Sequence, residues 1–269
     1  MRACLAFFRM RLQSGLQYRA AALAGIVTQF FWGGMEIGLY RAFYEGEGAP
    51  GKFPMAFSAL VSYIWLRQAF LALLNTWTYE NELFDAILSG NVAYELCRPC
   101  SLCGMWFART LALRLSRAAL RCGPILVLAA LLPAPWRLSL PASGGAFALF
   151  AASLLLSACV GSALCLLVYF SCFFTVSSEG IRSVLLPVAE LLSGSLIPLP
   201  MMPDGLAKTM ALSPFGALSN APLRIYSGDL AGADAWLAVG LQVFWLIVML
   251  SGGAALQRRG LRRLCVQGG

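Results

Sequence analysis

Polar side chains inside long apolar stretches are the first candidates for chemistry in this sequence. Five of them interrupt apolar runs: Glu36, Arg67, Gln68, Asn75 and Glu190. A charge at the centre of a bilayer costs about 3 kcal/mol on insertion scales, so such residues face protein or a water-filled pathway. They are candidates for contact with a transported substrate. Glu36 and Arg67 could instead form a structural ion pair, and the sequence leaves both interpretations open.

A second candidate is the short acidic segment from Glu80 to Leu88. Its apolar residues are spaced for one helical face: Leu83, Phe84, Ile87 and Leu88. Its acids, Glu80, Glu82 and Asp85, lie elsewhere on the helix. Such a helix could rest on the membrane surface. It could also seat its apolar face in the groove of a partner protein, whose basic residues would then pair with the acids.

Two other segments resemble ligand motifs but lack what those motifs need. Residues 46–52 read G-E-G-A-P-G-K, but a phosphate loop requires a hydroxyl where Phe53 stands, and a preceding strand. Cys97, Cys100 and Cys103 have the spacing of an iron–sulfur run, but Phe107 occupies the position of the fourth cysteine. We therefore expect packing cysteines, no bound metal and no ATP hydrolysis by this chain.

The chain contains no histidine, which removes histidine bases, histidine-activated nucleophiles and histidine metal ligands. We predict a non-catalytic protein with no catalytic residue and no cofactor of its own. The net charge of +8 could suggest a nucleic-acid partner, but in a membrane protein a basic excess more often reflects topology. We expect no nucleic-acid partner.

The elements that position these residues are predicted to be membrane-spanning helices. Hydrophobic residues make up 59% of the chain and charged residues 12%, whereas soluble domains carry about 25% charge. The apolar residues come in runs of about 20, the length that crosses a bilayer. We predict an all-α, polytopic membrane protein, a single domain over 1–269. Its six spans are expected at about 20–40, 57–77, 111–132, 145–170, 181–197 and 236–256.

Three further segments complete this prediction. Residues 1–19 form a basic interfacial helix, and 79–105 form a polar loop between spans two and three. Pro187 is expected to break the fifth span. Residues 198–222 are predicted to form a re-entrant hairpin, tolerated where protein or water satisfies its backbone. Its marker residues are Ser193, Gly194, Pro198, Pro200 and Pro203.

The distribution of positive charge predicts the orientation. Of the 20 cationic residues, 14 lie in the N-terminal segment, the second-to-third connection with the foot of span three, the fourth-to-fifth connection and the tail. The opposite loops hold five. Cytoplasmic segments are the richer in Lys and Arg, so both termini are expected in the cytoplasm.

Residues 89–99 read S-G-N-V-A-Y-E-L-C-R-P. With the basic N-terminal helix, the six spans and the Pro-rich segment before the last span, this motif resembles the ABC-2 type permeases, in particular small six-helix subunits of multidrug or viologen exporters. Cys100 and Cys103 are not part of that pattern. The resemblance covers nearly the whole chain.

The resemblance implies a permease subunit in a bacterial plasma (inner) membrane that pairs with a second permease, identical or paralogous. Two ATPase subunits, which carry the ATP and Mg, would dock beneath 80–99 and contact residues such as Tyr94, Glu95 and Arg98. The complex would move a small amphiphilic, cationic or lipid-linked substrate outward.

Three alternatives remain at this stage. An ion-gradient-driven carrier would use intramembrane acids such as Glu36 and Glu190 for coupling, and would show inverted repeats. A lipid-modifying membrane enzyme would need clustered acids or metal ligands at one membrane depth. A membrane anchor that only recruits an ATPase would tolerate polar-to-apolar changes throughout its bundle.

Overall fold

The computed structural model describes residues 2–46, 53–98, 100–175 and 177–262. Over these residues the fold is all-helical, with twelve α-helices, two 3-10 turns and no strand, which confirms the all-α prediction. The phosphate-loop-like residues 47–52, Pro99 at the end of the permease-like motif, and the last part of the basic tail lie outside the described residues.

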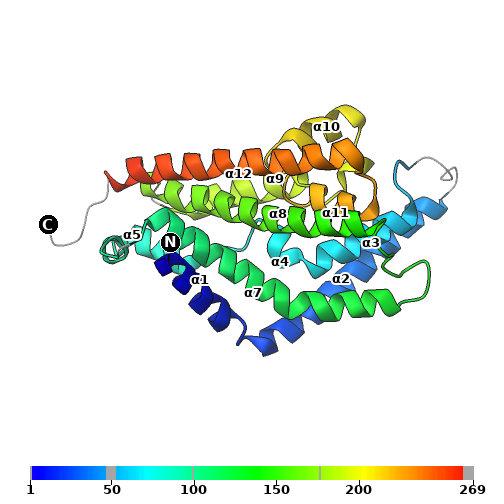
Figure 1. Cartoon of the computed structure of the whole chain (residues 1–269), viewed down its shortest axis with the longest axis horizontal. Coiled ribbons are helices and arrows are strands. Elements are labelled where there is room, and N and C mark those ends of the chain that lie inside the picture. The colour runs from blue at the N-terminus through cyan, green and yellow to red at the C-terminus, as the bar shows by residue number, and fades with distance from the viewer. Residues whose placement is uncertain (1, 47–52, 99, 176, 263–269) are drawn as a thin grey trace.

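Four long helices run through the molecule (Figure 1). They are α2 (Arg19–Glu45), α7 (Leu102–Leu131), α8 (Gly144–Ser171) and α12 (Gly232–Leu261). Among the described residues, three stretches are long and apolar enough to cross a membrane: Arg19–Glu45, Gly144–Phe174 and Gly232–Leu261. The second of these includes the 3-10 turn η1 (Cys172–Phe174). These helices mark the chain as a membrane protein.

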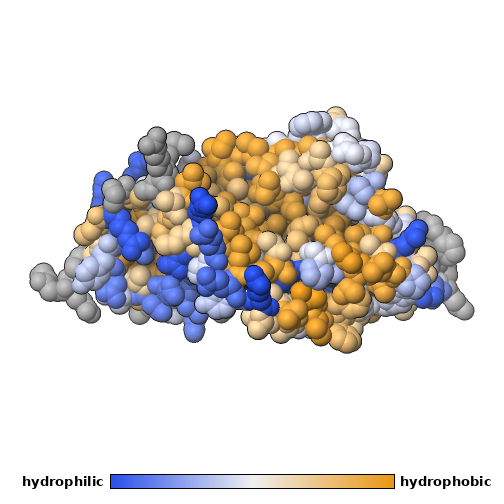
Figure 2. Space-filling view, turned by 60° about the horizontal axis from the view of Figure 1, so that its bottom comes forward, coloured by the Kyte–Doolittle hydropathy of each residue, from blue (hydrophilic) through white to orange (hydrophobic). Residues whose placement is uncertain are grey.

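The surface agrees with this assignment. Hydrophobic residues cover the middle of the molecule, and hydrophilic residues gather chiefly toward its two ends (Figure 2). Large apolar side chains of α2, such as Leu23, Val27 and Phe31, are exposed. An exposed apolar band of this kind is expected where lipid, and not water, surrounds a helix.

The segment predicted as one span over 57–77 is interrupted. It consists of α3 (Phe57–Ala69) and the single turn α4 (Leu71–Leu74), and the chain becomes extended at Asn75. The buried guanidinium of Arg114 donates from Nη1 to the backbone oxygens of Leu73, at 3.1 Å, and Asn75, at 2.8 Å. These bonds satisfy carbonyls that the helix end leaves free, and thereby allow the helix to stop inside the protein.

The prediction that Pro187 breaks the fifth span is wrong, because α9 (Glu179–Leu192) continues through it. Proline removes one backbone donor, and a helix can pass through it when neighbouring protein satisfies the freed group. The helix ends at Leu192, and Gly194, just past the C-cap residue Ser193, has a φ of +73° that suits glycine. A Cβ there would lie 3.2 Å from the hydroxyl of Tyr63.

The Pro-rich region after α9 contains three short elements: η2 (Leu199–Met201), α10 (Asp204–Leu212) and α11 (Asn220–Ser227). Pro198 and Pro203 immediately precede η2 and α10, and Pro200 lies within η2. Prolines at these positions cost no helical hydrogen bond, because the first residues of a helix have no intrahelical acceptor for their N–H groups.

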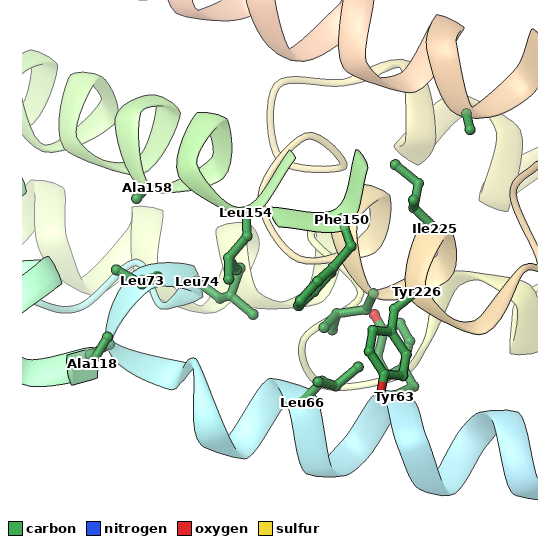
Figure 3. Packing of buried hydrophobic residues seen from close by; sticks show 13 residues of the cluster. Tyr63, Leu66, Leu73, Leu74, Ala118, Phe150, Leu154, Ala158, Ile225 and Tyr226 are labelled. Carbon is green, nitrogen blue, oxygen red and sulfur yellow. The ribbon is translucent and has the colours of Figure 1, made fainter. Parts of the chain in front are cut away.

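A buried apolar cluster joins α3, α4, α8 and α11 (Figure 3). In it the rings of Phe150 and Tyr226 pack edge to face with centroids 5.2 Å apart. Ser139, in the α7–α8 connection, accepts a hydrogen bond from the Tyr226 hydroxyl at 2.9 Å. The broken α3–α4 segment therefore contributes side chains from both of its parts to the buried core.

The end of the molecule that holds the candidate contact segment is built from short helices. There α1 (Arg2–Gly15), shorter than predicted, packs along α7. Close by lie α5 (Asn81–Leu88) and α6 (Val92–Leu96), and α12 ends at the same end of the molecule (Figure 1). The segment predicted as a polar loop over 79–105 is thus largely helical, and α7 begins within it at Leu102.

Candidate functional site

The apolar face of α5 is buried in its own chain. Leu83, Phe84 and Ile87 are at most 6% exposed and pack in a cluster with residues of α7 and α8. The interpretation that this face seats in a partner's groove is therefore wrong. The physical reason is that the ends of α7 and α8 already supply an apolar surface for it. Only Leu88 of the predicted face remains exposed.

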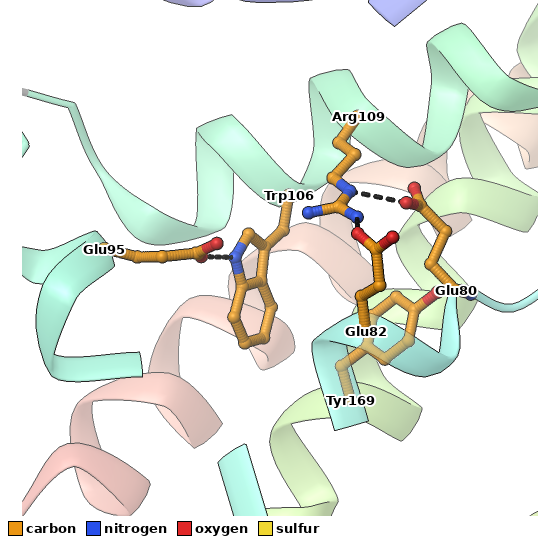
Figure 4. A network of polar contacts seen from close by, with 6 residues as sticks. All are labelled: Glu80, Glu82, Glu95, Trp106, Arg109 and Tyr169. Atoms are coloured by element: carbon orange, nitrogen blue, oxygen red, sulfur yellow. Dashed lines mark hydrogen bonds and ion pairs between the residues drawn. The ribbon is translucent and has the colours of Figure 1, made fainter. Parts of the chain in front are cut away.

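The acids of α5 are partly satisfied inside the chain (Figure 4). Arg109 of α7 donates from Nε to Glu80 at 2.5 Å and from Nη2 to Glu82. The backbone N–H of Glu80 donates to the hydroxyl oxygen of Tyr169, in α8, at 2.8 Å. The start of α5 is thereby tied to two long helices at once.

The helix α6 is held in a similar way. Trp106 of α7 donates from Nε1 to the carboxylate of Glu95, and its ring stacks on Phe170 with centroids 5.3 Å apart. Tyr94 is exposed, and Arg98 is exposed with only a long contact of 3.7 Å from Nη1 to the sulfur of Met105. Glu95 therefore positions α6, whereas Tyr94 and Arg98 are free to contact another molecule.

Five exposed residues of α5, α6 and the turn after α6 make up what we call the outer face: Glu82, Asp85, Leu88, Tyr94 and Arg98. The Asp85 side chain makes no ion pair or hydrogen bond within the described residues. This surface is acidic and partly apolar, and contacts with α7 and α8 hold it in place. It is suited to binding a basic surface of a partner.

Helix α9 contacts the same end of the molecule through one of its arginines. The Arg182 guanidinium lies over the rings of Tyr79 and Phe84, 5.2 Å from each centroid. Burial raises the pKa of the Tyr79 phenol above its ordinary value, so that it stays neutral at physiological pH. Burial acts to lower the pKa of Arg109, but Glu80 and Glu82 outweigh it and the pKa rises, so this guanidinium stays charged.

Four of the five intramembrane candidates meet between α2, α3 and α9. Arg67 Nη2 donates to the carboxylate of Glu36, and both side chains are largely buried. Gln68 also reaches Glu36, and Glu190 lies within electrostatic range of Arg67. Glu36 is thus paired with Arg67, whereas Glu190 makes no ion pair with it, and we call these four residues the intramembrane cluster.

The turn after α9 touches the same region. Tyr63 of α3 donates from its hydroxyl to the backbone oxygen of Gly194 at 2.9 Å. The Ser193 hydroxyl donates to the backbone oxygen of Glu190 at 3.2 Å. Of the residues marked as a hairpin from the sequence, Ser193 and Gly194 therefore lie next to the intramembrane cluster. Pro198, Pro200 and Pro203 shape the chain beyond it.

Asn75 lies in a different polar group. Its side-chain oxygen accepts from the Thr78 hydroxyl at 2.7 Å, and its backbone oxygen accepts from Arg114. Arg114 is fully buried and also reaches the sulfur of Cys165, at 3.2 Å. Asn75 therefore helps to end α4 and is not part of the intramembrane cluster.

Two residues important to this architecture were not singled out as sites from the sequence. Arg114 lies in a predicted span, as Arg67 does, so its charge was a sufficient signal. Gln242 is fully buried in α12 and donates to Ser157 and to the Ala217 oxygen, each at 2.9 Å. It is the only amide side chain in the predicted sixth span, and this could have revealed it.

Within the described residues, no group of three or more His, Cys, Asp or Glu side chains is arranged to hold a metal ion. Cys97 is exposed and Cys100 and Cys103 are half-buried, all as free thiols. No family model, no curated protein and no solved structure matches this chain. Its function is therefore argued from its residues and their geometry.

Proposed function

We propose that this chain is the permease subunit of an ABC-2 type exporter, powered by ATPase subunits on separate chains. It spans a bacterial inner membrane six times, through α2, α3–α4, α7, α8, α9 and α12. Both termini and the outer face of α5–α6 are cytoplasmic, and the region from η2 to α11 re-enters from the other side. It pairs with a second permease subunit, identical or paralogous.

The observation that carries this proposal is the way α5 and α6 are fastened. Arg109, Trp106 and Tyr169 connect them to α7 and α8, while Asp85 and Tyr94 stay exposed. A partner that moves α5 would therefore move two long helices with it, because buried and packed contacts transmit displacement between rigid elements. This is the mechanical requirement for receiving work from a separate ATPase.

The intramembrane cluster supports a transport pathway. Arg67 pairs with Glu36 and makes no ion pair with Glu190, so one carboxyl group of the cluster has no cationic partner within the described residues. An uncompensated charge in a membrane interior is costly and is typical of residues that line a substrate or ion pathway. The unpaired carboxyl group favours a cationic, amphiphilic substrate.

The proposal is tested at Asp85. In the permease reconstituted with its ATPase partner, Asp85→Lys is expected to lower transport-coupled ATPase activity about tenfold, because a like charge then faces the partner's basic surface. Asp204→Lys is the matched control, an exposed acid of α10. Equal activity of the two variants and the unaltered complex would contradict docking at the outer face.

The second candidate function is an ion-gradient-driven carrier, which the position of Glu36 and Glu190 within predicted spans favours. It predicts uptake or efflux by the purified chain alone in vesicles with a proton gradient and no nucleotide. Glu190→Gln would abolish that flux. Flux that requires ATP and a second protein would instead favour the exporter.

A further inference from the structure

A cavity of about 690 Å³ lies where α1, the start of α2, α5 and α7 converge. Four arginines line it, Arg11, Arg109, Arg117 and Arg121, together with two acids, Glu80 and Glu82. Both acids bind Arg109. Neither the exporter mechanism nor the intramembrane cluster uses the other three arginines.

Those three arginines have no carboxylate partner among the described residues. Arg117 and Arg121 are four residues apart on α7, a spacing at which like charges repel on a helix. Arg11 approaches from α1, and its Nε is buried without a hydrogen-bond partner. Positive charge gathered from two helices around one cavity is stable only when an anion or abundant water compensates it.

The cavity wall is shaped around Arg121. Its guanidinium lies against α2, where it donates to the Ala21 oxygen at 3.5 Å. A Cβ on Gly25 would lie 2.5 Å from the central carbon of this guanidinium, so the glycine makes room for it. The arginine is therefore seated in the wall and does not simply extend into solvent.

The start of α2 adds to the positive potential. Tyr18, Ala21 and Ala22 line the cavity, and the first turn of this 27-residue helix has no acidic residue and no side-chain cap. The N-terminus of a helix carries a partial positive charge and unpaired N–H groups, which favour anions.

We infer that this cavity binds a phosphate group, with Arg11, Arg117 and Arg121 as its ligands. Arginine presents a planar fork of donors that matches phosphate oxygens, and two forks on one helix with a third opposite can surround a tetrahedral anion. The exposed apolar side chains Leu23 and Val27 continue from the cavity along α2. They would accommodate acyl chains, so the phosphate can come from a lipid headgroup as well as from free phosphate.

The site requires a membrane protein but not transport, so a failure of the Asp85 experiment would leave it standing. The test uses the full chain purified in a maltoside detergent. Native mass spectrometry compares the retention of phosphatidylglycerol with that of a glycosyl diacylglycerol of the same acyl chains, which has no phosphate. Isothermal titration with inorganic phosphate forms the second arm.

Arg117→Gln and Arg121→Gln are each expected to weaken phosphatidylglycerol or phosphate binding about tenfold, the effect of losing one charge-assisted hydrogen bond. Arg11→Gln, on α1, provides an independent variant, and Arg258→Gln is the control, an exposed arginine of α12 with the same change in charge. A loss confined to phosphatidylglycerol identifies a lipid site, and a loss for inorganic phosphate identifies a free-phosphate site. The inference is overturned if the three cavity variants bind phosphatidylglycerol and inorganic phosphate as the control does. It is also overturned if the unaltered chain retains phosphatidylglycerol no better than the glycolipid and does not bind inorganic phosphate.

Discussion

Two arginines of α7 are buried, but their partners differ in kind. Arg109 donates to the carboxylates of Glu80 and Glu82, whereas Arg114 donates to backbone oxygens at the end of α4. The first arrangement fixes α5 against the long helices, and the second allows a helix to end inside the protein. In both cases the charge is retained because hydrogen bonds replace its lost hydration.

At this scale we predict that Arg109→Leu destabilises the protein by about 3 kcal/mol, because it leaves the largely buried Glu80 carboxylate without its partner. The measurement is unfolding of the detergent-solubilised chain followed by tryptophan fluorescence. The double variant Arg109→Leu with Glu80→Leu should recover part of the loss, since no buried charge is then unpaired. Arg258→Leu, at an exposed position, should change little, and a single-variant cost no larger than this control would refute the role of the pair.

At the scale of elements, the association of α8 with α12 rests on few polar contacts. Gln242 accepts from the Ser153 hydroxyl at 2.8 Å, and its amide nitrogen, with two hydrogens to donate, lies within hydrogen-bonding distance of three oxygens on α8 and the 213–219 turn. Interhelical hydrogen bonds matter in lipid because apolar helices gain little hydrophobic energy from one another. This network therefore sets the register of α12 on α8.

We predict that Gln242→Leu lowers stability by about 1–2 kcal/mol, the range measured for interhelical hydrogen bonds in model membrane helices. Leucine would also leave the Ala217 oxygen with the Ser157 hydroxyl, at 3.1 Å, as its remaining donor. Thermal unfolding in detergent measures the loss. Gln257→Leu, in the same helix but with no hydrogen-bond partner for its side chain among the described residues, serves as the control. Equal melting temperatures for the two variants would show that the network is dispensable.

Some of the long helices could be predicted from the sequence, and the interruptions between elements could not. The predicted spans 20–40, 145–170 and 236–256 each lie within one helix, because an uninterrupted apolar run has only one stable conformation in lipid. The interruption at Phe70 and the passage of α9 through Pro187 were not predictable in this way. The first depends on Arg114 of α7, which donates to the Leu73 and Asn75 oxygens, and a contact of that kind between distant segments cannot be read from the local sequence.

At the scale of the whole molecule, α5 and α10 lie toward opposite ends (Figure 1). The proposed topology places α5 in the cytoplasm and α10 outside. A cysteine at Asn81 should therefore be protected from a membrane-impermeant maleimide in intact cells, and a cysteine at Asp204 should react. The parent chain without the added cysteine measures the background, and disruption of the membrane should expose Asn81→Cys. Labelling of Asn81→Cys in intact cells would overturn the proposed orientation.

The sequence by itself determined that this chain is a helical membrane protein, because composition and run length decide which solvent surrounds a segment and lipid permits only internally bonded backbone. It also located the polar residues that matter, such as Glu36 and Arg67. Only the tertiary structure decided their partners: that Glu36 meets Arg67, that Asn75 does not join them, and that the apolar face of α5 is buried against α7 and α8. Such pairings depend on distances between segments far apart in the chain, and the periodicity of one helix contains no information about them.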